Sequence, residues 1–416
     1  MKNANAAQLN LFDHVTQVYA EANGTISNDQ LYQAVLVKAG IDPDDLQRKQ
    51  PIGQAQELHS PLKRKIRWYQ QTAKAMGLIE RVEDMRGLWQ ITQEGKTRLR
   101  KAEPTVAMLA FSTDLGIALW GPNARVLRNF SEPIHLLLTS PPYPIQNARA
   151  YGGCVESKYV DFICHALEPI VANLVPGGSI VLNLGNECFL PGLPARSIYR
   201  ERLVIALVDR FGLFKIDELI WRNGSKMPGP YPWTSKERFL LNPAYEPCYI
   251  FTNDPLRLIS NNQRVLQPHT EQHLKLIAQG GEKRTAVYGD GAYTIRPGSF
   301  GKPTAGRIPR NVLDFGHACS DQQRYKRICK EMGIVANAAP MPLKLAKFLI
   351  QFLTEPGQLV VDIFGGSFTT AKAAEQLARL WLSCDQIWEF VRGGAERFRC
   401  APGFFLNPLL ERAIQC

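Results

Sequence analysis

The chain has 416 residues, of which 45% are hydrophobic and 21% charged, a composition typical of a globular protein with two or three domains. Glycine and proline occur at about average frequency and no apolar run reaches the length of a membrane span, so the sequence excludes collagen-like, low-complexity and membrane-spanning proteins. The 49 lysines and arginines exceed the 38 acidic residues and give a formal net charge of +11, which favours a polyanionic partner.

The first hundred residues predict three helices followed by a two-stranded hairpin. The expected elements are a first helix that includes Leu11 to Tyr19, a second from Ser27 to Lys38, a third from Pro61 to Met76, and strands at Leu78–Val82 and Leu88–Thr92. This order resembles a winged helix-turn-helix. The segment from Gly87 to Leu99 is similar to the wing and last helix of winged modules found in restriction-modification proteins.

Positive charge is concentrated in two segments. Residues 60–101 hold 11 Lys and Arg against 4 Asp and Glu, and residues 256–310 hold 9 against 3. We therefore expect nucleic acid to be held at two places, one of them the winged module, whose third helix would lie in the major groove while the wing touches phosphates. The alternatives are basic faces that are only solvated, and a winged module used for packing or dimerisation.

From about Met108 onward, short apolar strands alternate with helices, which predicts a doubly wound α/β sheet. The expected strands are Ile134–Thr139, Ser179–Leu184, Glu218–Trp221, Tyr249–Phe251, Leu359–Asp362 and Trp381–Cys384. The expected helices include Tyr159–Leu174, Arg200–Phe211, Pro342–Leu353 and Thr370–Leu380. We place the boundary between the two domains at residue 104, with a small domain over 1–104 and a catalytic domain over 105–416.

Two loops at strand ends carry candidate chemistry. The first is Thr139-Ser140-Pro141-Pro142-Tyr143, in which two prolines stiffen the backbone and remove two N–H donors. What remains is a rigid loop of carbonyl oxygens, a hydroxyl and an aromatic ring, which suits a planar ligand with an exocyclic amine.

The second loop runs from Asp362 to Thr370, between a strand and a helix. Its Gly365-Gly366 pair allows the backbone to approach a ligand closely, as in nucleotide-binding βα turns. Asp385 follows Gly365 by twenty residues, at the end of the next strand, where a carboxylate can reach ribose hydroxyls.

The two loops together resemble the amino-methylating DNA methyltransferases that use S-adenosyl-L-methionine. The catalytic loop precedes the cofactor loop, which is the permuted order of the β class, and the similarity over about residues 108–400 is closest to the PvuII-type N4-cytosine methyltransferases. Further blocks follow in the family's order, at Val175–Ser179, Ile220–Asn223, Ile308–Leu313 and Asn337–Pro342.

This resemblance implies a Rossmann-like methyltransferase domain, S-adenosyl-L-methionine as cofactor, and double-stranded DNA as partner. It assigns Ser140, Pro141, Pro142 and Tyr143 to catalysis, and Asp362, Phe364, Gly365, Gly366, Ser367, Thr369 and Asp385 to the cofactor site. Ser140 and the Pro141 carbonyl would accept hydrogen bonds from the amine of a flipped cytosine that stacks on Tyr143. A restriction endonuclease acting on the same site would be a further partner of the protein. The sequence leaves open whether the protein itself is a monomer or a dimer.

The sequence departs from the family at Phe368, where Gly or Asn is usual, and at Asn337, where His is usual. Phe368 is expected to crowd the cofactor pocket, which keeps a catalytically silent DNA-binding regulator as an alternative. An adenine-N6 methyltransferase is the nearest rival, although Ser in the first position of Ser-Pro-Pro-Tyr is typical of cytosine-N4 enzymes and Asp of adenine-N6 enzymes. An RNA methyltransferase is a further alternative.

Three other patterns in the sequence bear on its chemistry. Residues 252–310 fall where this family inserts its target-recognition segment, and Arg and Asn/Gln side chains there could read base edges. Pro247-Cys248 resembles the setting of a cytosine-C5 nucleophile, but we favour a buried structural cysteine. His269 and His273 have a metal-compatible spacing without an acidic or thiol partner, so no metal site is predicted.

Nine cysteines occur singly, and Met1 to His14 lack the apolar stretch of a secretion signal. These features predict reduced thiols in the cytoplasm, and a DNA-binding function would place the protein at the bacterial nucleoid.

Overall fold

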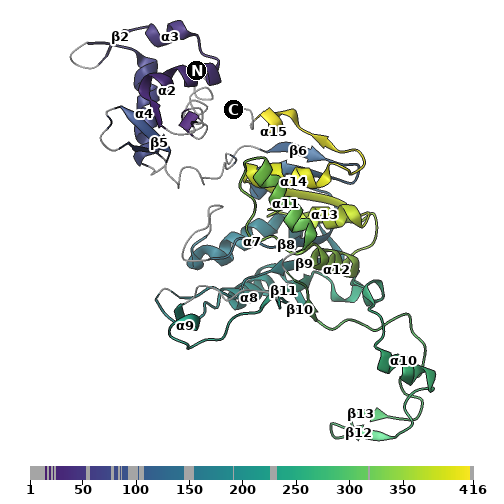
Figure 1. Cartoon of the computed structure of the whole chain (residues 1–416). Coiled ribbons are helices and arrows are strands. Elements are labelled where there is room, and N and C mark those ends of the chain that lie inside the picture. Colours follow the sequence, from purple (N-terminus) through teal and green to yellow (C-terminus); the bar gives the residue numbers. More distant parts are fainter. Residues whose placement is uncertain are drawn as a thin grey trace. The chain divides into compact units, whose positions relative to one another are not determined.

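In the computed structural model, the chain divides into two compact units, Met1–Leu99 with Pro408–Cys416, and Arg100–Asn407 (Figure 1). The structure describes residues 15, 18–19, 22, 25–52, 57–75, 79–82, 85, 87–91, 102, 107–144, 154–190, 192–224, 232–316 and 319–412. The expected domain bounds at residues 104 and 105 stay a prediction.

The first unit is a small α/β module around a three-stranded antiparallel sheet in the order β1-β5-β4. Its elements are β1 (Thr25–Ser27), α2 (Asn28–Ala39), α3 (Pro43–Gln47), β2 (Gln50–Ile52), β3 (Glu57–His59), α4 (Pro61–Ala75), β4 (Ile79–Arg81) and β5 (Leu88–Ile91). The last short helix of the chain, α15 (Pro408–Arg412), is grouped with this unit. The arrangement is compatible with a winged helix-turn-helix, which stays a prediction.

Local sequence explains the ends of α2. Ser27 accepts a hydrogen bond from the Gln30 amide while the Gln30 side chain accepts one from the Ser27 amide, which is a capping box. Gly40 ends the helix in the left-handed region at a φ of 62°. Leu31, Val35 and Ile66 bury one face of α2 and α4 in a common core, so the second and third predicted helices are confirmed.

Other parts of the first unit differ from expectation or lie outside the described residues. Helix α3 and the β2–β3 hairpin were not predicted, because three-residue strands and a five-residue helix show too little periodicity. Of the predicted first helix, only Val15, Val18 and Tyr19 are described, all of them helical and buried. The last helix expected in the Gly87–Leu99 segment falls after Ile91, outside the described residues.

The second unit contains a ten-stranded sheet in the order β14-β10-β11-β9-β8-β15-β16-β7-β6-β17 (Figure 1). Its strands are β6 (Met108–Ser112), β7 (Gly116–Trp120), β8 (Ile134–Thr139), β9 (Leu174–Asn183), β10 (Phe214–Arg222), β11 (Tyr245–Thr252), β14 (Val312–Asp314), β15 (Leu359–Asp362), β16 (Leu380–Asp385) and β17 (Phe405–Leu406). Its helices are α6 (Asn123–Val126), α7 (Glu156–Ala172), α8 (Tyr199–Phe211), α9 (Pro232–Ser235), α11 (Ser320–Glu331), α12 (Leu343–Leu353), α13 (Thr369–Gln376), α14 (Trp388–Ala395) and η3 (Glu396–Phe398).

Strand pairing brings the two predicted loops together. Strand β15 lies between β8 and β16 and is parallel to both, with Val361 opposite Leu137 and Leu382. Because the carboxyl ends of parallel neighbours meet at one edge of the sheet, the loops after β8, β15 and β16 converge there. The doubly wound α/β prediction is confirmed, and β10 and β11 add antiparallel pairs beyond β9.

The expected elements of this unit are found with shifted ends. Strands β8 and β15 have the predicted bounds, whereas β9, β10, β11 and β16 are longer than expected. Helix α13 ends at Gln376 instead of Leu380, because Leu380 already begins β16. Strands β6 and β7 and helix α14 had not been given bounds from the sequence.

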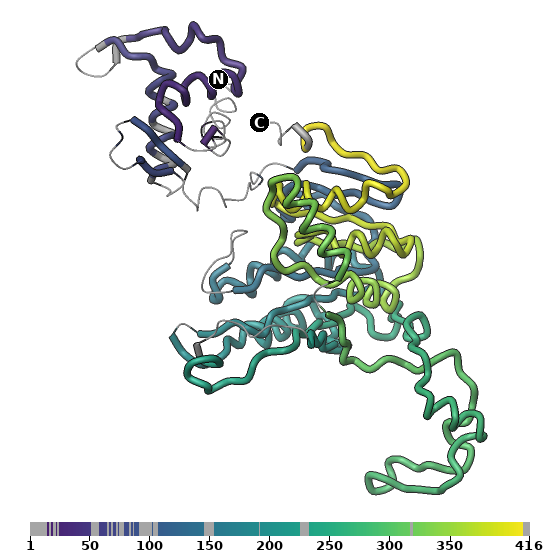
Figure 2. The backbone as a smooth tube through the Cα atoms, viewed as in Figure 1, coloured from purple at the N-terminus to yellow at the C-terminus, as the bar shows by residue number. Residues whose placement is uncertain are grey.

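Residues 267–307 form an arm that extends away from the sheet (Figure 2). Backbone hydrogen bonds between Gln267 and Arg307 close its base, at 3.0 and 2.9 Å. The arm contains α10 (Glu271–Ala278) and a hairpin of β12 (Ala286–Tyr288) and β13 (Tyr293–Ile295). It lies within the segment expected to recognise the target.

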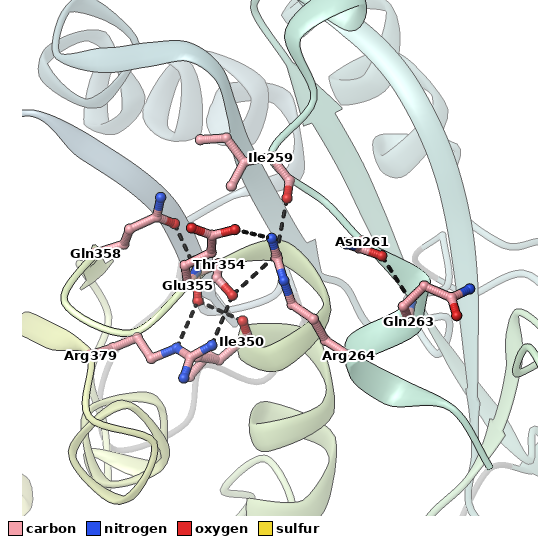
Figure 3. A network of polar contacts seen from close by, with 9 residues as sticks. All are labelled: Ile259, Asn261, Gln263, Arg264, Ile350, Thr354, Glu355, Gln358 and Arg379. Carbon is pink, nitrogen blue, oxygen red and sulfur yellow. Dashed lines mark hydrogen bonds and ion pairs between the residues drawn. The ribbon is translucent and has the colours of Figure 1, made fainter. Parts of the chain in front are cut away.

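A polar network anchors the chain leading into the arm, through the short helices η1 (Pro255–Arg257) and η2 (Asn262–Val265). Figure 3 shows the Arg264 guanidinium reaching the carbonyls of Ile259 and Thr354, at 3.0 and 3.2 Å, and the Glu355 carboxylate at 2.5 Å. Arg379 donates to the same Thr354 carbonyl at 2.8 Å. The arm therefore starts from a fixed point beside α12.

Candidate active site

A cavity of about 630 Å³ opens at the carboxyl ends of β8, β15 and β16. All the residues predicted for the site line it: Ser140, Pro141, Pro142, Tyr143, Asp362, Phe364, Gly365, Gly366, Ser367, Thr369 and Asp385. The structure therefore brings together two groups of residues that are far apart in the sequence. Their individual roles stay predictions.

The catalytic loop is held by its own side chains. Oγ of Ser140 lies 3.2 Å from Oη of Tyr143, and that hydroxyl donates to the Glu246 carboxylate, also at 3.2 Å. A Cβ at Gly185 would lie 2.6 Å from the Tyr143 ring, so the ring packs against bare backbone that only glycine leaves open. Burial and the Glu246 charge raise the pKa of Tyr143 well above its usual value, which keeps the phenol neutral.

Asp362 connects the two loops. Thr139, the residue before the Ser-Pro-Pro-Tyr segment, donates its hydroxyl to Oδ1 of Asp362 at 2.7 Å, and the Phe364 amide donates to the same oxygen at 3.2 Å. Burial raises the pKa of Asp362 to about 6. The position of one loop is thus fixed relative to the other.

Asp385 holds the glycine turn of the cofactor loop. Its carboxylate accepts from the Gly366 amide and from the Ile387 amide, both at 2.8 Å, and burial raises its pKa to about 6. Gly366 has a φ of +50°, and a Cβ there would lie 2.3 Å from Nδ2 of Asn337. A side chain at this position would be strained, so the backbone favours glycine here, and the Asn337 amide would also have to shift to make room.

Phe368 does not crowd the cavity, and this expectation is wrong. The residue has a φ of 59°, and its fully buried ring packs against Phe111 at a centroid distance of 5.3 Å. The left-handed backbone turns the side chain into the core beneath the loop instead of toward the ligand space. Asn337, the other departure from the family pattern, does line the cavity.

Sequence reasoning missed several residues of the site. Glu246 and Asn183 line the cavity from β11 and β9, and neither stands in a pattern that points to chemistry. Arg397 supports the cofactor loop by donating to the Ser367 carbonyl at 2.5 Å and to the Thr369 hydroxyl at 2.9 Å, and it also pairs with Asp321. An arginine within a three-residue helix such as η3 carries no sequence signal for this contact.

The structure also shows where Cys248 and the pair of His269 and His273 lie. Cys248 is fully buried in β11, burial raises its pKa to about 12, and it is not among the residues that line the cavity. It therefore occupies a structural position, as expected. The rings of His269 and His273 lie 4.8 Å apart in the arm. Within the described residues, no three His, Cys, Asp or Glu side chains gather as metal ligands, and no helix is long and apolar enough to span a membrane.

Comparison with known proteins agrees with this geometry. The family model of the DNA methylases, which covers N6 and N4 methyltransferases, matches residues 134–396, and the model of the Mrr N-terminal domain matches residues 10–101. The type II methyltransferase M.PvuII of Proteus hauseri is 36% identical over 290 residues, covering 70% of this chain and 85% of its own.

One solved structure gives the same picture. The PvuII DNA methyltransferase (cytosine-N4-specific) matches with a TM-score of 0.56 and 30% identity, covering 73% of this chain and 93% of its own. A DNA modification methylase of Thermus thermophilus, solved with S-adenosyl-L-methionine, matches at 19% identity over 67% of this chain and 91% of its own, with a TM-score of 0.41. Because the family model spans more than half of the sequence and the resemblance to M.PvuII extends over most of that relative, the chain belongs to the DNA methylase family of N6 and N4 methyltransferases.

Proposed function

We propose that the protein transfers the methyl group of S-adenosyl-L-methionine to the exocyclic N4 of cytosine in double-stranded DNA. The observation that carries this proposal is a cavity lined by both the Ser-Pro-Pro-Tyr loop and the glycine loop, with Thr139 and Asp362 tying one to the other. The similarity to the cytosine-N4-specific PvuII enzyme supports N4 over N6 as the acceptor atom.

The residues present fit the cofactor. A volume of about 630 Å³ lies within the range of small-molecule sites. The Gly365-Gly366 turn leaves the backbone open to a ligand, and Asp385, at the end of β16, can accept hydrogen bonds from ribose hydroxyls. Phe364 and Ile387 contribute apolar side chains to the wall of the cavity. When bound, S-adenosyl-L-methionine supplies an electrophilic methyl group on a positively charged sulfur.

The catalytic loop makes the amine of the base more nucleophilic. The lone pair of an exocyclic amine is delocalised into the ring, so the amine attacks poorly. Hydrogen bonds from its N–H groups to Oγ of Ser140 and to the Pro141 carbonyl localise the lone pair on nitrogen. The rigid proline backbone fixes these acceptors, and positioning of the two reactants provides most of the acceleration.

The target base must leave the duplex to reach this cavity, since its amine is paired inside the helix. Tyr143 can stack on the extruded base through the ring face that is not packed on Gly185. The arm, with its exposed Lys283, Arg296 and Lys302, would hold the flanking duplex together with the amino-terminal unit. A type II methyltransferase protects DNA from a restriction endonuclease that recognises the same site. Such an endonuclease would therefore be the partner of this protein.

Nucleoside analysis tests the proposal. Purified protein is incubated with unmethylated bacterial DNA and S-adenosyl-L-methionine, the DNA is digested, and methylated bases are identified by mass spectrometry. We expect N4-methylcytosine. N6-methyladenine would agree with methyl transfer to an exocyclic amine but refute cytosine as the target base. DNA left unmethylated under conditions where the cofactor binds would favour the DNA-binding regulator. RNA added as a competitor tests whether the substrate of the protein is DNA or RNA.

A further inference from the structure

Three polar groups form a row that leads out of the catalytic loop. Ser140, Tyr143 and Glu246 follow one another at 3.2 Å per step, and all three line the cavity. Ser140 and Tyr143 belong to the predicted catalytic segment, whereas Glu246 lies on β11, a distant part of the sequence.

The direction of the hydrogen bonds in this row is determined by its far end. A phenol has one hydrogen, and Tyr143 donates it to the Glu246 carboxylate, which can only accept while it is ionised. Oη of Tyr143 must therefore accept from Ser140, whose own hydrogen is used in that bond. The free lone pair of Oγ of Ser140 then faces the cavity as an acceptor, which is what an amine N–H requires.

The position of Glu246 is fixed by the strand on which it lies. It is the second residue of β11 and lies opposite Trp221 of β10, and the carbonyl of the next residue, Pro247, accepts a hydrogen bond from the Leu184 amide at 3.0 Å. The Glu246 side chain is half-buried at the cavity wall, while Tyr143 remains neutral because of its raised pKa. Hydrogen bonds in such a partly desolvated row are stronger than in water and polarise one another.

We propose that Glu246 is the positioning residue of the reaction: it orients the Ser140–Tyr143 pair and receives the proton that the amine loses. This inference rests on the proposed function. Another carboxylate that lines the cavity, Asp362, already accepts hydrogen bonds from Thr139 and Phe364 through one oxygen. Glu246 is the carboxylate in direct hydrogen-bond sequence with Ser140.

The step balances without any further reactant. The bond between the amine nitrogen and the methyl carbon forms as the sulfur–methyl bond breaks, and the nitrogen becomes positively charged. Its proton passes to Oγ of Ser140, the Ser140 proton passes to Oη of Tyr143, and the Tyr143 proton passes to the Glu246 carboxylate. Ser140 and Tyr143 end as they began, the product amine is neutral, and the Glu246 carboxylic acid returns its proton to solvent.

Glu246→Gln and Tyr143→Phe test this row. Glutamine can still accept from Tyr143 but does not take a proton at neutral pH, and phenylalanine keeps the ring but removes the connecting hydroxyl. We expect each variant to lower the single-turnover rate of methyl transfer by about 100-fold, in the range of general acid–base catalysis. The Kd values for S-adenosyl-L-methionine, by calorimetry, and for DNA, by fluorescence anisotropy, should stay within about twofold of wild type.

The double variant gives the sharpest result. Residues that act as one unit are not additive, so Glu246→Gln combined with Tyr143→Phe should remain about 100-fold slow instead of about 10,000-fold. Glu246→Asp, which keeps the carboxylate on a shorter chain, should recover part of the rate. Glu218→Gln is the matched control, because it removes a partly exposed carboxylate from the neighbouring strand β10, where Glu218 pairs with Lys215 at 2.9 Å.

Wild-type rates in Tyr143→Phe or in Glu246→Gln, or additive losses in the double variant, would overturn the inference. Loss of cofactor binding or a lowered melting temperature in parallel with the rate would assign Glu246 a purely structural role and overturn it as well. Failure of the proposed function is distinguishable, because in that case the wild-type protein itself produces no methylated base.

Discussion

The cavity and the arm belong to the same unit but are stabilised in different ways. At the cavity, Asp362, Asp385 and Arg397 each form hydrogen bonds with two or more groups, at least one of them from a distant part of the chain, and these contacts of the chain itself fix the two loops. In the arm, Tyr293 is 73% exposed and Phe300 is 61% exposed, and backbone hydrogen bonds close it at its base and between Glu282 and Gly298–Ser299. Reaction chemistry requires atoms at fixed positions, whereas a surface that follows a duplex needs reach and charge.

The largest effect is expected at the catalytic loop. Ser140→Ala removes the hydroxyl acceptor of the amine, so methyl transfer should fall by about 10²- to 10⁴-fold in single-turnover assays. The Kd of S-adenosyl-L-methionine, measured by calorimetry, should be unchanged, because Ser140 belongs to the target side of the cavity. Equal loss of transfer and cofactor binding would instead mean that the loop only supports the fold.

Phe368 and Phe300 provide a direct comparison of the two regions. Both have a positive φ, 59° and 61°, but Phe368 is fully buried beneath the cofactor loop and Phe300 is exposed in the arm. Phe368→Ala should lower the free energy of unfolding by about 3–5 kcal/mol through the cavity that it leaves. Phe300→Ala should change it by less than about 0.5 kcal/mol. Urea denaturation measures both, and similar values would contradict the buried packing of Phe368.

Asp385→Asn separates cofactor binding from the rest of the site. Loss of the charged acceptor should weaken S-adenosyl-L-methionine by about 10- to 100-fold at pH 8, as is usual for hydrogen bonds to charged groups. In the wild-type protein the affinity should also decline as the pH falls through about 6, because the raised pKa of Asp385 places the loss of its charge there. Calorimetry across pH 5–8 measures this, and an equally steep pH profile in Asp385→Asn would assign the titration to another group.

The same shift predicts a trend in the stability of the ligand-free protein. The folded-state pKa values of Asp362 and Asp385, about 6, lie above the ordinary 3.8, so the folded state binds these protons more tightly than the unfolded chain. The contribution of the two groups to stability is therefore greatest below about pH 4 and is lost as the pH rises to about 6. Thermal denaturation of the Asp362→Asn/Asp385→Asn variant, compared with wild type across this pH range, gives the contribution of the two carboxyl groups to stability.

The arm should contribute charge without affecting the chemistry. Lys283→Ala/Arg296→Ala/Lys302→Ala removes three exposed cations, and DNA affinity at about 0.15 M salt should fall by about 10-fold. The slope of log Kd against log salt should decrease by about 1 for each phosphate that is no longer neutralised. Cofactor affinity should remain that of the wild type, and a changed value would show that the arm and the cavity are coupled.

The smallest effect is expected in the amino-terminal unit. Arg64, Arg67 and Lys74 are exposed on α4, and their combined replacement by Ala should weaken DNA binding by about threefold, because the catalytic unit retains its own contacts. The salt slope should flatten as well. An unchanged slope would place this unit in packing or dimerisation.

Neighbouring residues specify the elements that depend on local chemistry. Strands β8 and β15, the capped helix α2, and the two loops with their prolines and glycines were all predicted, since short-range periodicity and backbone restrictions are encoded by neighbouring residues. Burial of Cys248 was also predicted from the apolar strand around it.

Contacts between distant side chains depend on the complete fold. Glu246 reaches Tyr143, and Arg397 reaches Ser367 and Thr369, through strand order and helix packing that no local pattern encodes. The direction of Phe368 was misjudged for the same reason: a left-handed φ turned its ring from the pocket into the core. A motif specifies the residues of a loop, but the contacts made by those residues depend on segments distant in the chain, which only folding brings together.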